Sequence, residues 1–105
     1  MEFKQAAIRF KAISDETRLK IVAMLADNEF CACQILEAFH FTQPTLSYHM
    51  KILTESGLVS GNKVGSWMHY NLNHAVWQEL LRFMEQLPAY PADRTCLTCL
   101  NKPCP

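Results

Sequence analysis

The sequence predicts one mainly helical domain that carries a single β-hairpin. Its 105 residues suffice for one compact core. Apolar side chains recur three or four residues apart through most of the chain, which is the spacing of amphipathic helices. Short β-prone runs with glycines interrupt this pattern between residues 58 and 72. We therefore expect a folded domain over residues 1–87 and a cysteine-containing tail over residues 88–105.

Charge is balanced overall but unevenly distributed. Ten basic and ten acidic residues give a formal net charge of zero, which argues against a chain that coats nucleic acid indiscriminately. Residues 42–72 carry only Lys51, Lys63 and Glu55 as formal charges, so this stretch is mildly cationic. The first ten residues are amphipathic, unlike a secretory signal or a membrane span. The expectation is a cytoplasmic protein with no membrane partner.

The first half of the chain contains three expected helices. One apolar stripe runs from Phe3 to Ile13, and Ser14 or Asp15 can cap the next segment, Glu16 to Ala26. A short third helix is expected from Cys31 to Phe39. The second helix should be largely buried through its apolar residues, namely Leu19, Ile21, Val22, Met24 and Leu25.

A fourth helix should follow a tight turn at His40 and Phe41. Thr42 suits its N-cap, and Pro44 falls in the first turn, where a missing amide hydrogen costs little. The helix should extend to about Ser56, with Gly57 at the C-terminal cap. Its buried stripe is expected to consist of Leu46, Met50 and Leu53.

The second half predicts a hairpin and a last helix. Residues 58–63 and 67–72 read as two strands, with Gly61 and Gly65 at the tip between them. From Asn73 to Leu87 the apolar residues cover more than one helical stripe. Because so small a chain cannot bury both faces by itself, we expect a homodimer.

The outward face of the fourth helix has the chemistry of a DNA reader. Gln can bond an adenine edge, Ser and Thr can bond bases or phosphates, and Lys attracts phosphate. The alternative is an ordinary helical hairpin with a solvated face, but the β-hairpin that follows favours a winged helix-turn-helix. The expected contacts to double-stranded DNA are Gln43, Thr45, Ser47, Tyr48 and Lys51 on the helix and Lys63 on the wing.

Five cysteines suit metal binding or redox chemistry better than a disulfide framework. Cys31 and Cys33 lie near a helix start, where cysteines are either ligands or small buried packing residues. The tail cysteines have the C-x2-C-x4-C spacing of a zinc knuckle but no clear fourth ligand, so a structural zinc site and an unstructured tail both remain open. These tail residues are Cys96, Cys99 and Cys104.

Three segments together resemble the ArsR/SmtB family of metalloregulatory repressors. They are SDETRL at residues 14–19, TQPTLSYHMKIL at residues 42–53 and ESGLV at residues 55–59. The likeness spans roughly residues 3–87. It implies a dimeric winged helix protein whose first and last helices form the interface. It also implies that the dimer occupies an operator and leaves it when metal binds.

Residues 29–33, EFCAC, are similar to the CxC signature of the arsenic-responsive members of that family. The resemblance implies that Cys31 and Cys33 bind As(III) or Sb(III), with Cd(II), Pb(II) or Zn(II) as alternatives. Some arsenic sensors carry a third cysteine where this chain has Leu36, so the third thiolate is expected from Cys96, Cys99 or Cys104, in the same chain or its partner. At the last-helix positions of zinc sensors this chain offers only His74.

Two expectations concern mechanism and alternatives. Residues two apart on a regular helix point about 200° from each other, so we expect metalloid binding by Cys31 and Cys33 to unwind the start of their helix. An oxidation-responsive repressor with the same frame is a second hypothesis. A thiol-disulfide enzyme is a third, and it is disfavoured because no βαβ pattern surrounds either cysteine pair.

Overall fold

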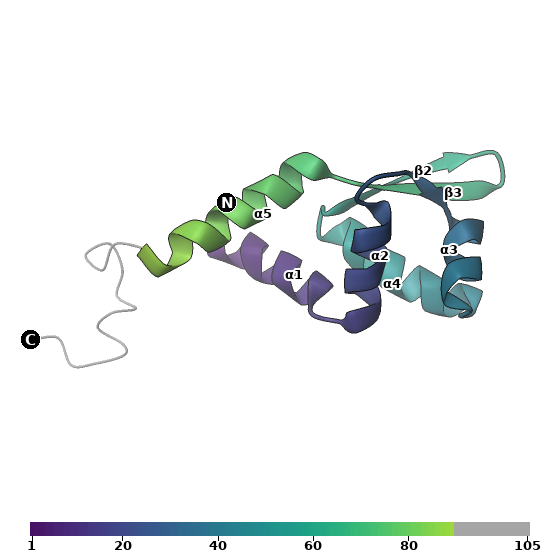
Figure 1. The fold of residues 1–105 in the computed structure, drawn as a ribbon, viewed down its shortest axis with the longest axis horizontal. Helices are drawn as coiled ribbons and strands as arrows, with labels where there is room; N and C mark the ends of the chain where they lie inside the picture. Colours follow the sequence, from purple (N-terminus) through teal and green to yellow (C-terminus); the bar gives the residue numbers. More distant parts are fainter. Residues whose placement is uncertain (90–105) are drawn as a thin grey trace, which may run out of the picture.

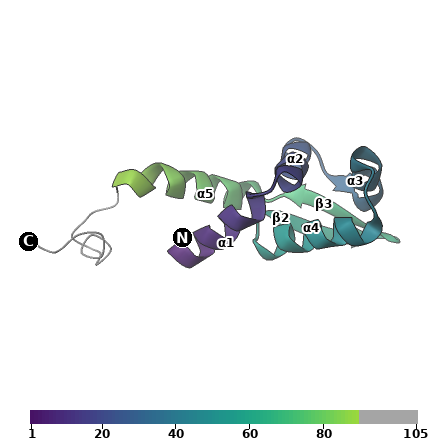
Figure 2. The ribbon, with the colours of Figure 1, turned by 90° about the horizontal axis from the view of Figure 1, so that it is seen from below.

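The computed structural model describes residues 1–89. The chain forms a helical frame with a small antiparallel sheet, as Figures 1 and 2 show from two sides. The helices are α1 (Phe3–Ile13), α2 (Glu16–Leu25), α3 (Ala32–Phe39), α4 (Gln43–Glu55) and α5 (His74–Gln86), followed by a 3-10 turn, η1 (Leu87–Ala89). The strands are β1 (Phe30–Cys31), β2 (Val59–Val64) and β3 (Trp67–Leu72). The predicted order of helices and hairpin is confirmed.

The sheet has the strand order β1-β3-β2. Strands β2 and β3 form the predicted hairpin, here called the wing, with Val59 opposite Leu72 and Val64 opposite Trp67. Strand β1 was not predicted. It places Phe30 opposite Tyr70 and Cys31 opposite His69. The start of α3 is therefore tied directly to β3, the wing strand in the middle of the sheet.

The core lies where α2, α3 and α4 meet the sheet. The predicted stripe of α4 is confirmed, since Leu46, Met50 and Leu53 are buried. The prediction that Leu19 belongs to the core is wrong, because its side chain is 49% exposed on the outer side of α2. The other fully buried large side chains are Ile21, Leu25, Ile35, Leu58 and Leu80.

Two glycines were predicted at the tip of the hairpin, and only one of these placements is right. Gly65 lies at the hairpin tip as expected and has φ 63°, a conformation that other residues adopt only with strain. Gly61 was also expected at the tip but lies inside β2, opposite Tyr70. The strand simply continues through it, so the placement of Gly61 in the turn is wrong.

Helices α1 and α5 lie together at one end of the molecule, away from α3 and the hairpin tip (Figures 1 and 2). Phe3 of α1 meets Phe83 of α5 edge to face, with ring centroids 5.5 Å apart. Only Leu80 of α5 is buried. Large apolar side chains on these two helices remain substantially exposed, namely Phe3, Ile8, Leu81 and Met84.

Two arginines fix α4 against the first two helices. Arg18 of α2 donates from Nε to the Ala12 carbonyl at 2.7 Å, and its Nη1 lies 3.1 Å from Nδ1 of His49 in α4. Arg9 of α1 donates from Nε to the carbonyl of Ser56 at 3.0 Å, and Ser56 is the C-cap residue of α4. The middle and the C-terminal end of α4 are therefore both anchored.

Asp15 caps α2, because its carboxylate accepts from the Arg18 backbone N–H at 3.0 Å. This hydrogen bond is the main reason that the pKa of Asp15 lies below its ordinary value. A carboxyl group whose pKa is lowered by folding stabilises the fold above its unfolded pKa, about 3.9, and loses that contribution as the pH falls through the folded value.

We expect Asp15→Ala to lower the Tm at neutral pH. The difference in Tm between wild type and variant should become smaller below about pH 4. Asp15→Asn keeps a neutral cap and should lose less. Calorimetry across the acid range measures both effects. A difference that stays constant with pH would contradict the role assigned to the charged cap.

Candidate nucleic-acid interface and cysteine pair

Helices α3 and α4 form a helix-turn-helix. His40 ends α3 in the left-handed conformation, with φ 57°, and so lets the chain reverse within two residues. The rings of Phe39 and Phe41 stack with centroids 5.4 Å apart and close the turn. Thr42 then caps α4, accepting from the Thr45 backbone N–H at 3.4 Å. The predicted cap residue is confirmed.

The side chains predicted to contact DNA are exposed. On α4 these are Gln43, Thr45, Ser47, Tyr48 and Lys51, and on the wing Lys63. Tyr48 is 62% exposed and its ring lies beside that of His49. His49 itself is half-buried and held by Arg18. It therefore fixes the orientation of α4 and is not one of the side chains expected to contact DNA. The arrangement leaves hydroxyl, amide and ammonium groups free to meet DNA.

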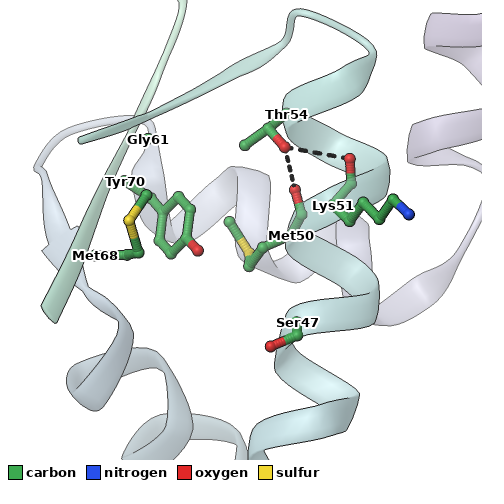
Figure 3. Close-up of a pocket in the computed structure, with 7 residues that line it drawn as sticks. All are labelled: Ser47, Met50, Lys51, Thr54, Gly61, Met68 and Tyr70. Carbon is green, nitrogen blue, oxygen red and sulfur yellow. Dashed lines mark hydrogen bonds between the residues drawn. The ribbon is translucent and has the colours of Figure 1, made fainter. Parts of the chain in front are cut away.

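A cleft of about 360 Å³ opens between α4 and the wing (Figure 3). Helix α4 contributes Ser47, Met50, Lys51 and Thr54, and the wing contributes Gly61, Met68 and Tyr70. Tyr70 was not predicted as a site residue, because a tyrosine in a β-strand does not by itself indicate a binding role. Burial raises the pKa of its hydroxyl above the ordinary value, which keeps that group protonated and able to donate.

Cys31 and Cys33 are joined in a disulfide, with Cα atoms 5.4 Å apart. Cys31 is the N-cap of α3 and has extended backbone angles, φ −79° and ψ 159°. Its side chain therefore does not follow the helical rotation. The expectation that the two sulfur atoms can meet only if the helix unwinds is wrong, because Cys31 lies outside the first turn.

The cysteine pair borders the wing. Cys31 pairs with His69 of β3, and His69 Nδ1 lies 2.9 Å from Oε2 of Glu29, two residues before Cys31. The Cys31 backbone N–H donates to Oε1 of Gln34 at 2.8 Å, which secures the start of α3. Sequence reasoning missed these contacts because they depend on β1, which is only two residues long.

The three cysteines among which the third metal ligand was predicted lie outside the described residues. They are Cys96, Cys99 and Cys104. Within residues 1–89, no group of three or more His, Cys, Asp or Glu side chains gathers closely enough to hold a metal ion. Within the same residues, no helix is long and apolar enough to cross a membrane.

A helix-turn-helix followed by a two-stranded wing, with polar side chains exposed on the second helix, defines a winged helix DNA-binding protein. Residues 15–60 match the family model described as bacterial regulatory protein, arsR family.

Relatives and solved structures agree with this class. Over 82 residues the chain is 43% identical to the arsenical resistance operon repressor of Staphylococcus aureus, covering 78% of this chain and 79% of the relative. The repressor of the same name from Staphylococcus xylosus is 43% identical over 86 residues, which cover 82% of this chain and 79% of that relative. The solved structure of an ArsR-like transcriptional regulator from Rhodococcus sp. RHA1 superposes with a TM-score of 0.75 at 26% identity. The superposition covers 93% of this chain and 92% of that one.

The chain belongs to the ArsR family of bacterial regulatory proteins. It is a DNA-binding transcriptional repressor and not an enzyme. This outcome confirms the family resemblance and the winged helix fold predicted from the sequence.

Lys51→Ala should weaken binding to all DNA sequences, because an ammonium group on phosphate carries no base information. The slope of log affinity against log salt should fall by about one. Lys20→Ala is a matched control, since Lys20 is exposed but paired with Glu16 at 2.9 Å on α2. Unchanged affinity in the combined Ser47→Ala, Lys51→Ala variant would refute α4 as the DNA-reading helix.

Proposed function

We propose that the chain is a dimeric operator-binding repressor that trivalent arsenic or antimony releases from DNA through Cys31 and Cys33. The observation that carries this proposal is the cysteine pair, whose sulfur atoms meet at the start of α3 beside the wing. The names of the staphylococcal relatives support arsenic as the inducer. The site of action is then the cytoplasm, where the thiols are kept reduced.

The chemistry of the pair suits a soft, three-coordinate centre. Reduced Cys31 and Cys33 offer two thiolates that can share one atom without unwinding α3, and such metalloids favour soft sulfur ligands. A third thiolate would come from Cys96, Cys99 or Cys104, in the same subunit or its partner. Cd(II) and Pb(II) are alternative inducers with the same ligand preference. Zn(II) is an alternative for the tail cluster.

The signal would pass through Cys31 itself. This residue ends β1 and caps α3, so a shift of its backbone displaces β3 on one side and α3 on the other. Helix α3 packs on α4, and β3 forms the inner strand of the wing. Both DNA-contacting elements therefore adjoin the sensing residue. A coupling of about 1–3 kcal/mol, or 5- to 150-fold in affinity, makes a useful switch.

A second candidate function rests on the disulfide. Oxidation of Cys31 and Cys33 removes both thiolates without disturbing the first turn of α3, so a repressor that responds to oxidants is compatible with the same geometry. The two candidates differ in the reagent that releases DNA. Arsenite acts on the reduced protein, whereas a peroxide acts by forming the disulfide.

The double substitution Cys31→Ser and Cys33→Ser should leave a repressor that binds its operator with wild-type affinity but is no longer released by arsenite. The physical reason is that the DNA-facing side chains do not include these thiols. Fluorescence anisotropy of labelled operator, titrated with arsenite, antimonite, cadmium, lead and zinc, measures the response. Cys96→Ser, Cys99→Ser and Cys104→Ser tested singly identify the third ligand.

Two results would decide against this assignment. A full arsenite response in the double variant, lost instead in a tail variant, would move the sensing site to the C-terminal cysteines. Release of the wild type by peroxide, with no response of the reduced protein to any metalloid, would favour the oxidation-responsive candidate.

Assembly gives a further prediction. Helices α1 and α5 lie at one end of the molecule (Figure 1), and both carry exposed large apolar side chains that a second copy can cover. We expect a twofold dimer that presents its two α4 helices about one DNA turn apart. Sedimentation should show the dimer at micromolar concentration, and Leu81→Glu with Met84→Glu should shift it to monomer. A stable wild-type monomer would contradict this expectation.

A further inference from the structure

The cleft between α4 and the wing contains hydroxyl groups that differ in their availability. Thr54 Oγ1 lies 2.8 Å from the Met50 carbonyl and 3.2 Å from the Lys51 carbonyl, so its hydrogen is committed to the backbone of α4. The hydroxyls of Ser47 and Tyr70 have no hydrogen-bonding partner within residues 1–89. Figure 3 shows both of them directed into the gap between helix and strand.

The described lining of the cleft carries no negative charge. Within residues 1–89, Lys51 is the only ionised residue that lines it, and no carboxylate does. Figure 3 shows the Lys51 ammonium group on the side of α4 that faces away from Tyr70 and the wing, so the charge lies next to the cleft but does not point into it. The available polar groups that face the gap are therefore the two hydroxyls, which can both donate to one phosphate group with no carboxylate in the described lining to repel it.

Gly61 keeps the tyrosine in this position. A Cβ atom at residue 61 would lie 3.0 Å from Cε1 of Tyr70 and 3.0 Å from Cε of Met68. A side chain at residue 61 would press on the Tyr70 ring, so glycine gives that ring the room to cross β2 and reach toward α4. The glycine inside the strand is thus explained by the close approach of its cross-strand neighbour.

We propose that this cleft binds one phosphate group of the DNA backbone, with the hydroxyls of Tyr70 and Ser47 as hydrogen-bond donors. The ligand is a phosphodiester of the duplex on which α4 rests, because the cleft adjoins the exposed face of α4 and is bounded by the wing. The contact positions the recognition helix relative to the wing and carries no base information. The inference rests on the proposed operator binding.

The phosphate contact also adjoins the sensing strand. Tyr70 is paired with Phe30, and Phe30 directly precedes Cys31. A displacement of β1 would therefore move the Tyr70 hydroxyl relative to Ser47, which belongs to a different element. The cleft is the place where a movement of the wing against α4 changes a DNA contact.

Tyr70→Phe tests the proposal, because it removes one hydroxyl and keeps the ring. The probes are the duplex that the wild-type protein selects from a random-sequence pool and an unrelated duplex, each measured by anisotropy at several salt concentrations. A lost hydrogen bond to a charged acceptor should weaken binding to both duplexes about tenfold for each cleft engaged. The salt slope should not change, because no charge is removed.

Thr54→Val is the matched control, since it removes a hydroxyl of the same cleft that faces the helix backbone; its affinity should equal that of the wild type. Gly61→Ala should weaken both duplexes as Tyr70→Phe does, and combining the two should add little. Unchanged affinity in Tyr70→Phe at an unchanged Tm would overturn the proposal, as would a loss confined to the selected duplex. A wild type that selects no duplex would instead refute operator binding itself.

Discussion

The pairing of β1 with β3 is the constraint on which the rest of the arrangement depends. Two residues, Phe30 and Cys31, extend the sheet by one short strand, and the helix α3 begins at the next residue. Cys31 must therefore have extended backbone angles as a strand residue and as an N-cap at once. This double role places its sulfur beside that of Cys33, fixes α3 against the wing, and brings Glu29 to His69.

The sequence predicts what is local and leaves out what depends on pairing. The stripe of α4, its N-cap at Thr42 and the hairpin all follow from neighbours a few residues apart, and each is confirmed. The C-cap of α4 is Ser56, one residue before the predicted Gly57, which follows it with φ 86°. Strand β1 could not be predicted, because two residues are too few to show alternation. The error about the cysteine pair has the same origin, since the helical rotation was applied to a residue that a distant strand holds outside the helix.

The surface proposed for assembly and the surface proposed for DNA contact belong to different helices. Helices α1 and α5 carry exposed large apolar side chains, and α4 carries exposed polar ones. Arg9 and Arg18 link α1 and α2 to α4 through the Ser56 carbonyl and His49. Sequence reasoning could not assign these roles, because a surface arginine and an anchoring one look alike without the fold. A rigid link of this kind lets the geometry of a dimer fix the spacing of its two recognition helices.

An N-cap is a suitable place for a sensor because its bonds can change while the helix remains. The hydrogen bond from the Cys31 N–H to Gln34 is of a kind that contributes about 1 kcal/mol, so its loss is comparable to the 1–3 kcal/mol that an allosteric coupling requires. The remaining hydrogen bonds of α3 are untouched by such a change. If metalloid binding at Cys31 releases DNA as proposed, linkage requires that bound DNA weaken metalloid binding by the same factor. The proposed switch would need only a small displacement, because Cys31 already belongs to the same sheet as the wing.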